Sequence, residues 1–328
     1  MRSFLKTKSR ELILLAVLAV IAVVATSITP AFIKRLNIIN ILNNNATLGV
    51  MAMGMMVVIV TGNIDVSVGA QYAVAGMVVA LFAKATNGQQ VVPAILLGML
   101  TGMVLGLFNG ILIAKLNIPA IVVTLGTLSI MRGVLNLITS GNWVDGLGGP
   151  FGKFANIRIL GYPLAVHIWI LVVVLTALLL YGTRWGRDIL CVGGNKMAAQ
   201  RLGISQTKAY LLSFAYSGAL AGLAAAIAAS KLKIAQPSNG TGYEMQLIAA
   251  CVIGGTQFSG GIASVLGTFL GVLLLGMVDN ALVLAKVPVY WQELVTGIII
   301  ILAVISGALN RGGVGRRVAK EGASDAAK

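Results

Sequence analysis

Four acidic side chains lie in or at the edges of long apolar stretches, and they are the first candidates for chemistry in this chain. They are Asp65, Glu244, Asp279 and Glu293. Because an isolated charge is costly in apolar surroundings, such a group usually faces a cavity or a partner. Asp65 has Asn63 and Ser67 beside it. Two roles are open for Asp65: it caps a helix that begins near Ser67, or it lines a solute path.

Residues that support catalysis or metal binding are scarce. The chain has one histidine, His167, and two cysteines, Cys191 and Cys251, which lie far apart. No catalytic triad can be assembled with confidence around this histidine, and the cysteines form no metal-binding motif. The phosphate-binding pattern GxxxxGK[ST] does not occur, so the chain has no P-loop of its own for ATP. We therefore expect no enzymatic activity, no catalytic residue, no bound metal and no cofactor.

The elements that position these residues are membrane-spanning helices. Hydrophobic residues make up 58% of the 328-residue chain and charged residues 10%, compared with about 25% charged in a typical soluble domain. Uncharged apolar stretches of about 18 or more residues can cross a bilayer. The candidate spans are 12–33, 41–61, 66–83, 92–114, 118–139, 160–183, 209–230, 245–284 and 291–309. The sequence predicts an all-α, polytopic helix bundle in the lipid bilayer.

The distribution of positive charge along the chain indicates the membrane topology of this bundle. The net charge is +15, and lysines and arginines gather before the first span, in 184–208 and after residue 310. Basic loops of this kind mark the cytoplasmic side, so we expect no nucleic-acid partner. If all three clusters are cytoplasmic, an even number of spans separates each pair, which requires 245–284 to be split at Gly260-Gly261. This parity predicts one transmembrane domain over 1–328 with ten spans and with cytoplasmic tails at 1–11 and 311–328.

The first span resembles a signal peptide only in part. It follows basic residues, but its apolar run is longer than the roughly 7–15 residues of a typical signal core. We therefore interpret 12–33 as a retained span.

Small residues predict close helix packing. Gly98, Gly102, Gly106 and Gly110 recur every four residues, and Gly218 and Gly222 have the same spacing. Glycines at this spacing lie on one helix face and let two backbones approach closely.

Two interrupted apolar runs echo each other. At a fixed offset, segment 60–69 matches 252–261 at Gly62 and Gly254, at Ser67 and Ser259, and at Gly69 and Gly261. The match is either coincidence or an internal repeat, parallel or inverted, and transporters often place the solute path at such broken or re-entrant helices. The predicted path or gate residues are Asn63, Asp65, Ser67, Glu244, Thr256, Gln257 and Ser259.

The loop 184–208 contains a short helix with its own capping signals. Asn195 is a suitable N-cap for a two-turn helix over 196–202, and Gly203 is a suitable C-terminal stop. A capped helix on the cytoplasmic side either docks a cytoplasmic partner or is an amphipathic connector.

Ordered motifs over nearly the whole chain resemble those of ribose-type bacterial sugar ABC importer permeases. The first motif is NIDVSVG at 63–69, and the second combines IPA, TLGTL and RG within 118–133. The third combines GGN, AA and LGI within 193–204, and the fourth combines a glutamate, IAA and VIGG within 244–255. Val66 departs from the family's more common leucine, which is a mild change.

The resemblance implies a type II ABC importer-like fold and a set of partners. Such permeases lie in the bacterial inner membrane with a second permease subunit, which is a second copy or a paralogue. They work with two cytoplasmic ATP-binding subunits and a periplasmic solute-binding protein. The family's coupling helix, which contacts the ATPase, corresponds here to Gly193, Gly194, Asn195, Lys196, Ala198, Ala199, Gln200, Arg201, Leu202 and Gly203.

The solute is less sharply indicated than the family. Segments 139–147, 240–244 and 283–291 look most like autoinducer-2 permeases and some rhamnose-type relatives. We rank autoinducer-2 first, and rhamnose or another monosaccharide second. Two rival hypotheses are a proton-coupled secondary transporter of a small polar solute that uses Asp65 or Glu244, and a membrane scaffold that transports nothing.

Overall fold

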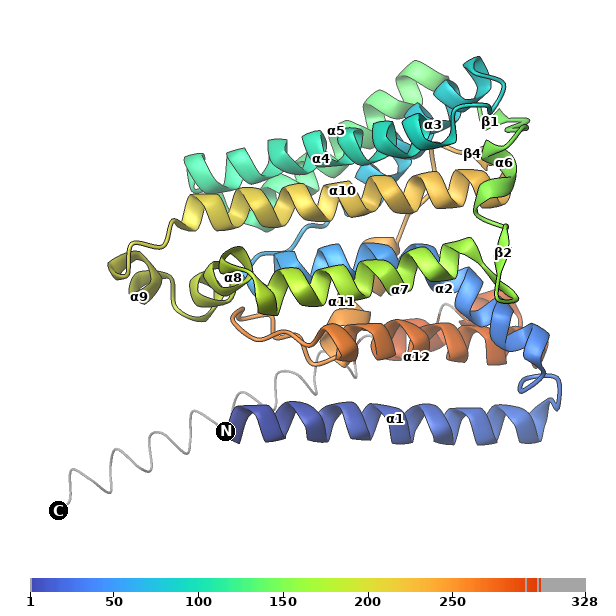
Figure 1. The fold of residues 1–328 in the computed structure, drawn as a ribbon, viewed down its shortest axis with the longest axis horizontal. Coiled ribbons are helices and arrows are strands. Elements are labelled where there is room, and N and C mark those ends of the chain that lie inside the picture. The colour runs from blue at the N-terminus through green and yellow to red at the C-terminus, as the bar shows by residue number, and fades with distance from the viewer. Residues whose placement is uncertain (1, 293, 300, 302–328) are drawn as a thin grey trace.

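The protein is a bundle of long helices that lie side by side (Figure 1). The structure is a computed structural model that describes residues 2–292, 294–299 and 301. In this part of the chain, eight helices are long and apolar enough to cross a membrane. The predicted helical membrane bundle is confirmed.

The elements follow the predicted apolar stretches closely. They are α1 (Arg2–Ile28), α2 (Arg35–Val60), α3 (Val68–Ala85), α4 (Val91–Leu116), α5 (Ala120–Thr139), β1 (Val144–Asp145), α6 (Phe151–Phe154), β2 (Arg158–Ile159), β3 (Tyr162–Pro163), α7 (Leu164–Ala177) with the π-helix Leu178–Gly182, α8 (Arg184–Gly194), α9 (Lys196–Arg201), α10 (Gln206–Leu232), β4 (Ile234–Ala235), α11 (Tyr243–Ile253) and α12 (Val265–Leu284).

The first helix differs from its prediction at both ends. It begins at Arg2, within the predicted tail 1–11, and it ends at Ile28 instead of residue 33. Pro30 explains the earlier end, because proline cannot continue a helix and restricts the residue before it. The predicted tail 311–328 lies outside the described residues.

The two ends of the bundle are built differently. α8 and α9 lie at one end, whereas α6 and the short strands lie at the other (Figure 1). There β1 pairs antiparallel with β4, with Val144 opposite Ala235, and β2 pairs antiparallel with β3. α1 begins at the α8 end (Figure 1), and six membrane-length helices separate that beginning from α8. An even number of spans between the first two basic clusters is what the charge pattern predicts.

The predicted division of 245–284 occurs, but its first half does not form a complete span. Residues 254–264 lie between α11 and α12, and they include the predicted break at Gly260-Gly261. α11 has 11 residues, about 16 Å at 1.5 Å per residue, which is roughly half of a bilayer core. The predicted span 291–309 extends beyond the described residues, of which 289–292 and 294–299 are helical.

The core lies where α10 packs between α4 on one side and α2 and α7 on the other (Figure 1). The glycines predicted to allow close packing lie at the contact of α4 with α10. A Cβ atom on Gly102 would collide with the backbone of Gly218, and one on Gly98 would come within 2.9 Å of the carbonyl oxygen of Gly222. Backbone-to-backbone contact therefore fixes the position of α10.

Gly218→Ala should lower the thermal unfolding midpoint of the purified chain in detergent. The added methyl group would meet the Gly102 backbone, and such overpacking costs about 1–3 kcal/mol. Gly126→Ala is the matched control, because a Cβ there meets nothing within 4 Å. Equal midpoints for the two variants would contradict the packing assigned to Gly218.

Candidate functional site

A buried polar network occupies the break between α2 and α3. The side chain of Asp65 has no exposed surface. Its Oδ1 accepts the backbone N–H of Ser67 at 3.0 Å and the Ser67 hydroxyl at 2.6 Å, and its Oδ2 accepts Nε2 of Gln71 at 2.8 Å. Asp65 therefore caps the start of α3, which is one of the two roles left open by the sequence.

Ser67 extends this network to a neighbouring helix. Its Oγ accepts Nε2 of Gln71 at 2.9 Å and Nδ2 of Asn109 in α4 at 2.8 Å. Nearby, Nδ2 of Asn63 donates to Oγ1 of Thr61 at 2.9 Å. The sequence-based list missed Gln71 and Asn109. In the sequence, Gln71 is a polar residue one helical turn after Ser67, and Asn109 is an amide within an otherwise apolar stretch. Both side chains are fully buried in the structure.

Glu244 lies close to the same region. It is in the first turn of α11 and is partly exposed. A Cβ atom on Gly69 would lie 2.8 Å from its Oε2. The structure therefore brings Glu244 to the start of α3, beside the segment that contains Asn63, Asp65 and Ser67.

The other three predicted path residues lie in the second break, between α11 and α12. Thr256 is buried and its Oγ1 lies 3.5 Å from Oγ1 of Thr268. Ser259 is exposed, and its Oγ donates to Oε1 of Gln257 at 3.5 Å. The seven predicted residues thus form two groups, one for each break.

The two breaks touch each other and touch α8. The backbone N–H of Gly261 donates to the carbonyl oxygen of Val60 at 2.8 Å. A Cβ atom on Gly260 would lie 2.7 Å from the carbonyl oxygen of Gly193 and 2.9 Å from the nitrogen of Gly62. We call these four glycines, 62, 193, 260 and 261, the glycine junction.

Gly193 is the member of the glycine junction that belongs to α8. A Cβ atom on it would collide with the carbonyl oxygen of Val60 and come within 2.6 Å of the nitrogen of Gly261. The last turn of α8 therefore rests directly on the end of α2 and on the second break.

The predicted short helix after α8 is confirmed, with both of its caps. Oδ1 of Asn195 accepts the backbone N–H of Ala198 at 3.0 Å. At the other end Gly203 has φ +77°, and the N–H groups of Gly203 and Ile204 donate to the carbonyls of Gln200 and Ala199, each at 3.0 Å. This pair of bonds is the Schellman arrangement, so α9 is a locally stable element.

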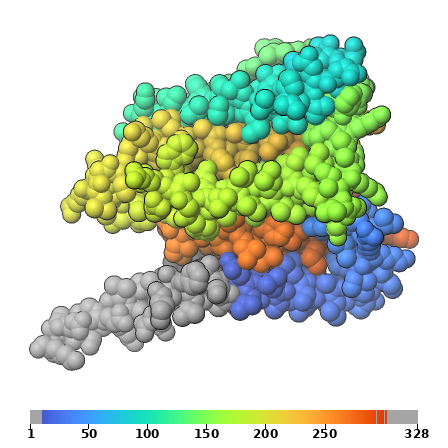
Figure 2. All heavy atoms as spheres, viewed as in Figure 1, coloured from blue at the N-terminus to red at the C-terminus, as the bar shows by residue number. Residues whose placement is uncertain are grey.

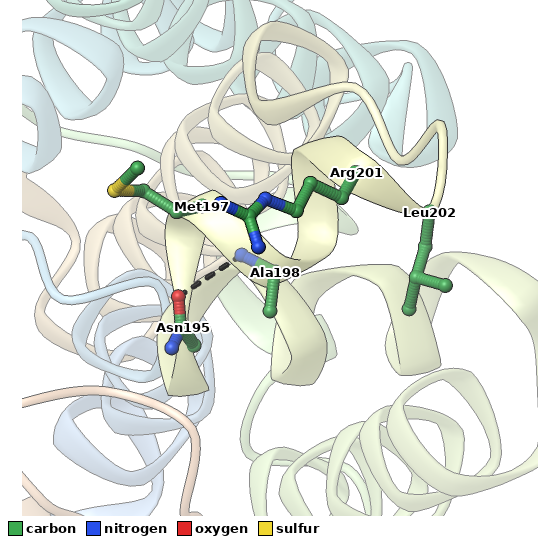
Figure 3. A pocket seen from close by; sticks show the side chains of 5 residues that line it. All are labelled: Asn195, Met197, Ala198, Arg201 and Leu202. Atoms are coloured by element: carbon green, nitrogen blue, oxygen red, sulfur yellow. Dashed lines mark hydrogen bonds between the residues drawn. The ribbon is translucent and has the colours of Figure 1, made fainter.

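α9 and its flanks present an exposed surface. Asn195, Met197, Ala198, Arg201 and Leu202 line an open pocket of about 420 Å³ (Figure 3). Met197 is 69% exposed and Leu202 77% exposed. In Figure 2 the yellow segment around residue 200 protrudes from the end of the bundle. Exposed apolar side chains at a projecting end are typical of a contact surface.

Comparison with known proteins decides the family. Residues 37–304 match the family described as "branched-chain amino acid transport system / permease component". The chain belongs to this permease family. It is a multi-pass membrane protein, since eight of its described helices can span a membrane.

Similar permeases cover most of the chain. A ribose import permease of Bacillus subtilis (strain 168) is 39% identical over 280 residues, which are 85% of this chain and 86% of the relative. An autoinducer 2 import system permease of Escherichia coli (strain K12 / DH10B) is 36% identical over 78% of this chain and 74% of the relative. One from Enterobacter sp. (strain 638) is 35% identical over 93% and 88%. No solved structure matched the chain. The predicted resemblance to ribose-type permeases is confirmed.

Gly193→Ala should destabilise the permease by about 1–3 kcal/mol, because the methyl group forces α8 away from the glycine junction. Gly194→Ala is the matched control, since its Cβ would lie 3.9 Å from the nearest atom, the Cα of Gly261. Thermal unfolding in detergent measures both variants. If Gly194→Ala were as damaging as Gly193→Ala, the contact with Val60 would not be the cause.

Asp65→Ala should destabilise the permease by more than about 2 kcal/mol, because it leaves buried donors of Ser67 and Gln71 without an acceptor. Asp65→Asn should cost less, since Oδ1 is kept and the amide of Gln71 can turn its unpartnered Oε1 toward the new donor. Unfolding midpoints of the two variants test this order, and a reversed order would contradict the capping role.

Proposed function

We propose that this chain is the permease subunit of a bacterial ABC importer for a sugar or sugar-like small solute. The solute would pass from the periplasm to the cytoplasm, with energy from ATP hydrolysis in partner subunits. The observation that carries the proposal is α9, a projecting helix capped at both ends that is joined through α8 to both helix breaks. The names of the similar ribose and autoinducer-2 import permeases support the same class.

The proposed assembly contains this permease, a second permease subunit, two cytoplasmic ATP-binding subunits and a periplasmic solute-binding protein in the inner membrane. The chain forms one transmembrane domain over 1–328, with its tails at 1–11 and 311–328 in the cytoplasm. The α8 end of the bundle faces the cytoplasm in this proposal, because the basic loop 184–208 lies there. The site residues 193–203 then contact an ATP-binding subunit.

Coupling follows from the contacts of α8. Movement of α9 by the ATP-binding subunit displaces α8, and the backbone of Gly193 passes that displacement to Val60 and Gly261. Both breaks then move with the ends of α2 and α12. ATP-driven closure would therefore bias a two-state equilibrium between outward- and inward-facing forms.

For the solute, we propose autoinducer-2 first, and rhamnose or another monosaccharide second. Uptake of autoinducer-2, L-rhamnose and D-ribose by the reconstituted complex, each with its cognate binding protein, would rank them. Uptake by this chain alone under a pH gradient would instead favour a proton-coupled carrier. Asp65 gives that alternative little support, because its carboxylate has no exposed surface and accepts three hydrogen bonds.

Leu202→Asp should abolish co-purification of the ATP-binding subunits while the permease still inserts into the membrane. Leu202 is 77% exposed beside α9, and a carboxylate at this position would have to be desolvated in the interface without a partner, which is strongly unfavourable. Leu160→Asp is the control, because Leu160 is 87% exposed in the loop between β2 and β3 at the opposite end. Retained co-purification in Leu202→Asp would contradict the docking role of α9.

A further inference from the structure

Two opposite charges lie partly exposed within the helix bundle, and neither takes part in the contacts described above for coupling. They are Arg132 in α5 and Glu244 in the first turn of α11. A charged side chain at membrane depth is costly, and it is normally retained where it faces a water-filled path or a partner. These two residues therefore require an explanation beyond packing.

Arg132 is held by backbone carbonyls that come from two other segments. Its Nη1 donates to the carbonyl of Pro237 at 2.5 Å, and its Nη2 donates to the carbonyl of Gly69 at 3.3 Å. Among the described residues these are its two hydrogen bonds, whereas a guanidinium carries five N–H donors. The side chain is fixed in direction and keeps donors available.

Glu244 also adjoins Gly69, because its Oε2 would lie 2.8 Å from a Cβ atom on that residue. The two charges attract each other. In the described part of the chain, the ion pair shorter than 4 Å is that of Lys84 and Asp145, so Arg132 and Glu244 are separated by more than a direct contact.

The side chains of both residues are partly exposed. A Cβ atom on Gly133, next to Arg132, would meet nothing within 4 Å, and the same holds for Gly242, two residues before Glu244. Met245 is 52% exposed. Neither charge is enclosed by its own chain, in contrast to Asp65.

We propose that Arg132 and Glu244 form a solute-contact site for an uncharged, polyhydroxylated molecule. Arg132 donates to hydroxyl oxygens and Glu244 accepts from hydroxyl groups. The pair has no net charge, so it favours neither an anion nor a cation, whereas paired donors and acceptors suit the hydroxyls of a sugar. This inference rests on the proposed import of a sugar-like solute and names the residues that touch it.

The competing explanation is that Arg132 only positions the segment that carries Pro237. A solute-contact site must be reachable from water, which labelling of a cysteine tests because a thiol reacts as a thiolate and needs water. In the assembled complex with Cys191→Ser, Arg132→Cys and Glu244→Cys are each treated with a positively charged, membrane-impermeant methanethiosulfonate reagent on both membrane sides. Ile130→Cys is the matched control on α5, since Ile130 is 63% exposed but apolar. Trp143→Cys, 61% exposed near the strand end, is the positive control.

We expect cysteines at 132 and 244 to react as the cysteine at 143 does, and the cysteine at 130 to stay at background. Reaction at 132 and 244 no faster than at 130 would overturn the solute-contact site. Each of the two positions tests the site independently. If one variant fails to assemble, the labelling of the other variant still decides. The labelling needs no solute, so its result does not depend on whether the complex imports a sugar. Failure of the wild-type complex to import any sugar would contradict the proposed function and not the solute-contact site.

A transport measurement distinguishes a solute-contact role of Arg132 from a positioning role. With D-ribose and its binding protein, Arg132→Gln should lower imported ribose per ATP hydrolysed by roughly tenfold to hundredfold, the factor that loss of a hydrogen bond to a charged group carries. Arg132→Lys should lose less, because the charge remains. A parallel fall of import and ATP hydrolysis, with their ratio unchanged, would show a positioning role and overturn the proposal.

Discussion

Backbone N–H and C=O groups in a bilayer find no water, so every helix break at membrane depth must be satisfied by the protein itself. The described part of the chain has two such breaks, 61–67 and 254–264. The first is stabilised by the carboxylate of Asp65, which accepts the free N–H of Ser67. The second is tied to the first by the bond from the N–H of Gly261 to the carbonyl of Val60. Each break is therefore stable only in the presence of the other elements.

Close approach of backbones is the second consequence of the same constraint. At the contact of α4 with α10 and at the glycine junction, the absence of side chains lets carbonyl oxygens reach positions that a Cβ would occupy. The two places differ in how a displacement of one segment would affect the other. α4 and α10 are long, continuous helices packed along their length, whereas the glycine junction joins the ends of segments. Displacement of α8 is therefore expected to act on the breaks before it deforms the bundle.

Local sequence signals predicted much of this structure because they depend on neighbouring residues alone. Hydropathy located the long helices through residue 232, and the caps of α9 followed from Asn195 and Gly203. Contacts between distant segments left no such signal: Gly193 rests on Val60, and Asn109 donates to Ser67. The half-length α11 was also missed, because its apolar run continues beyond Ile253 into a segment whose glycines at 255, 260 and 261 have positive φ.

Burial divides the polar residues near the first break into two kinds. Asp65 is fully buried and accepts three hydrogen bonds, so a solute could bind it only by breaking bonds that hold the start of α3. Arg132 and Glu244 are partly exposed and keep unused hydrogen-bonding capacity, and both adjoin Gly69, which lies in the first turn of α3, two residues after Ser67. One of the two carbonyls that orient Arg132, that of Gly69, is thus positioned by the helix start that Asp65 fixes. Val60, which contacts α8, ends the helix before the same break. In the proposed mechanism, a change at the glycine junction therefore reaches the carbonyl of Gly69 through residues 61–69, which places the proposed coupling contact and the proposed solute contact at the two ends of this segment.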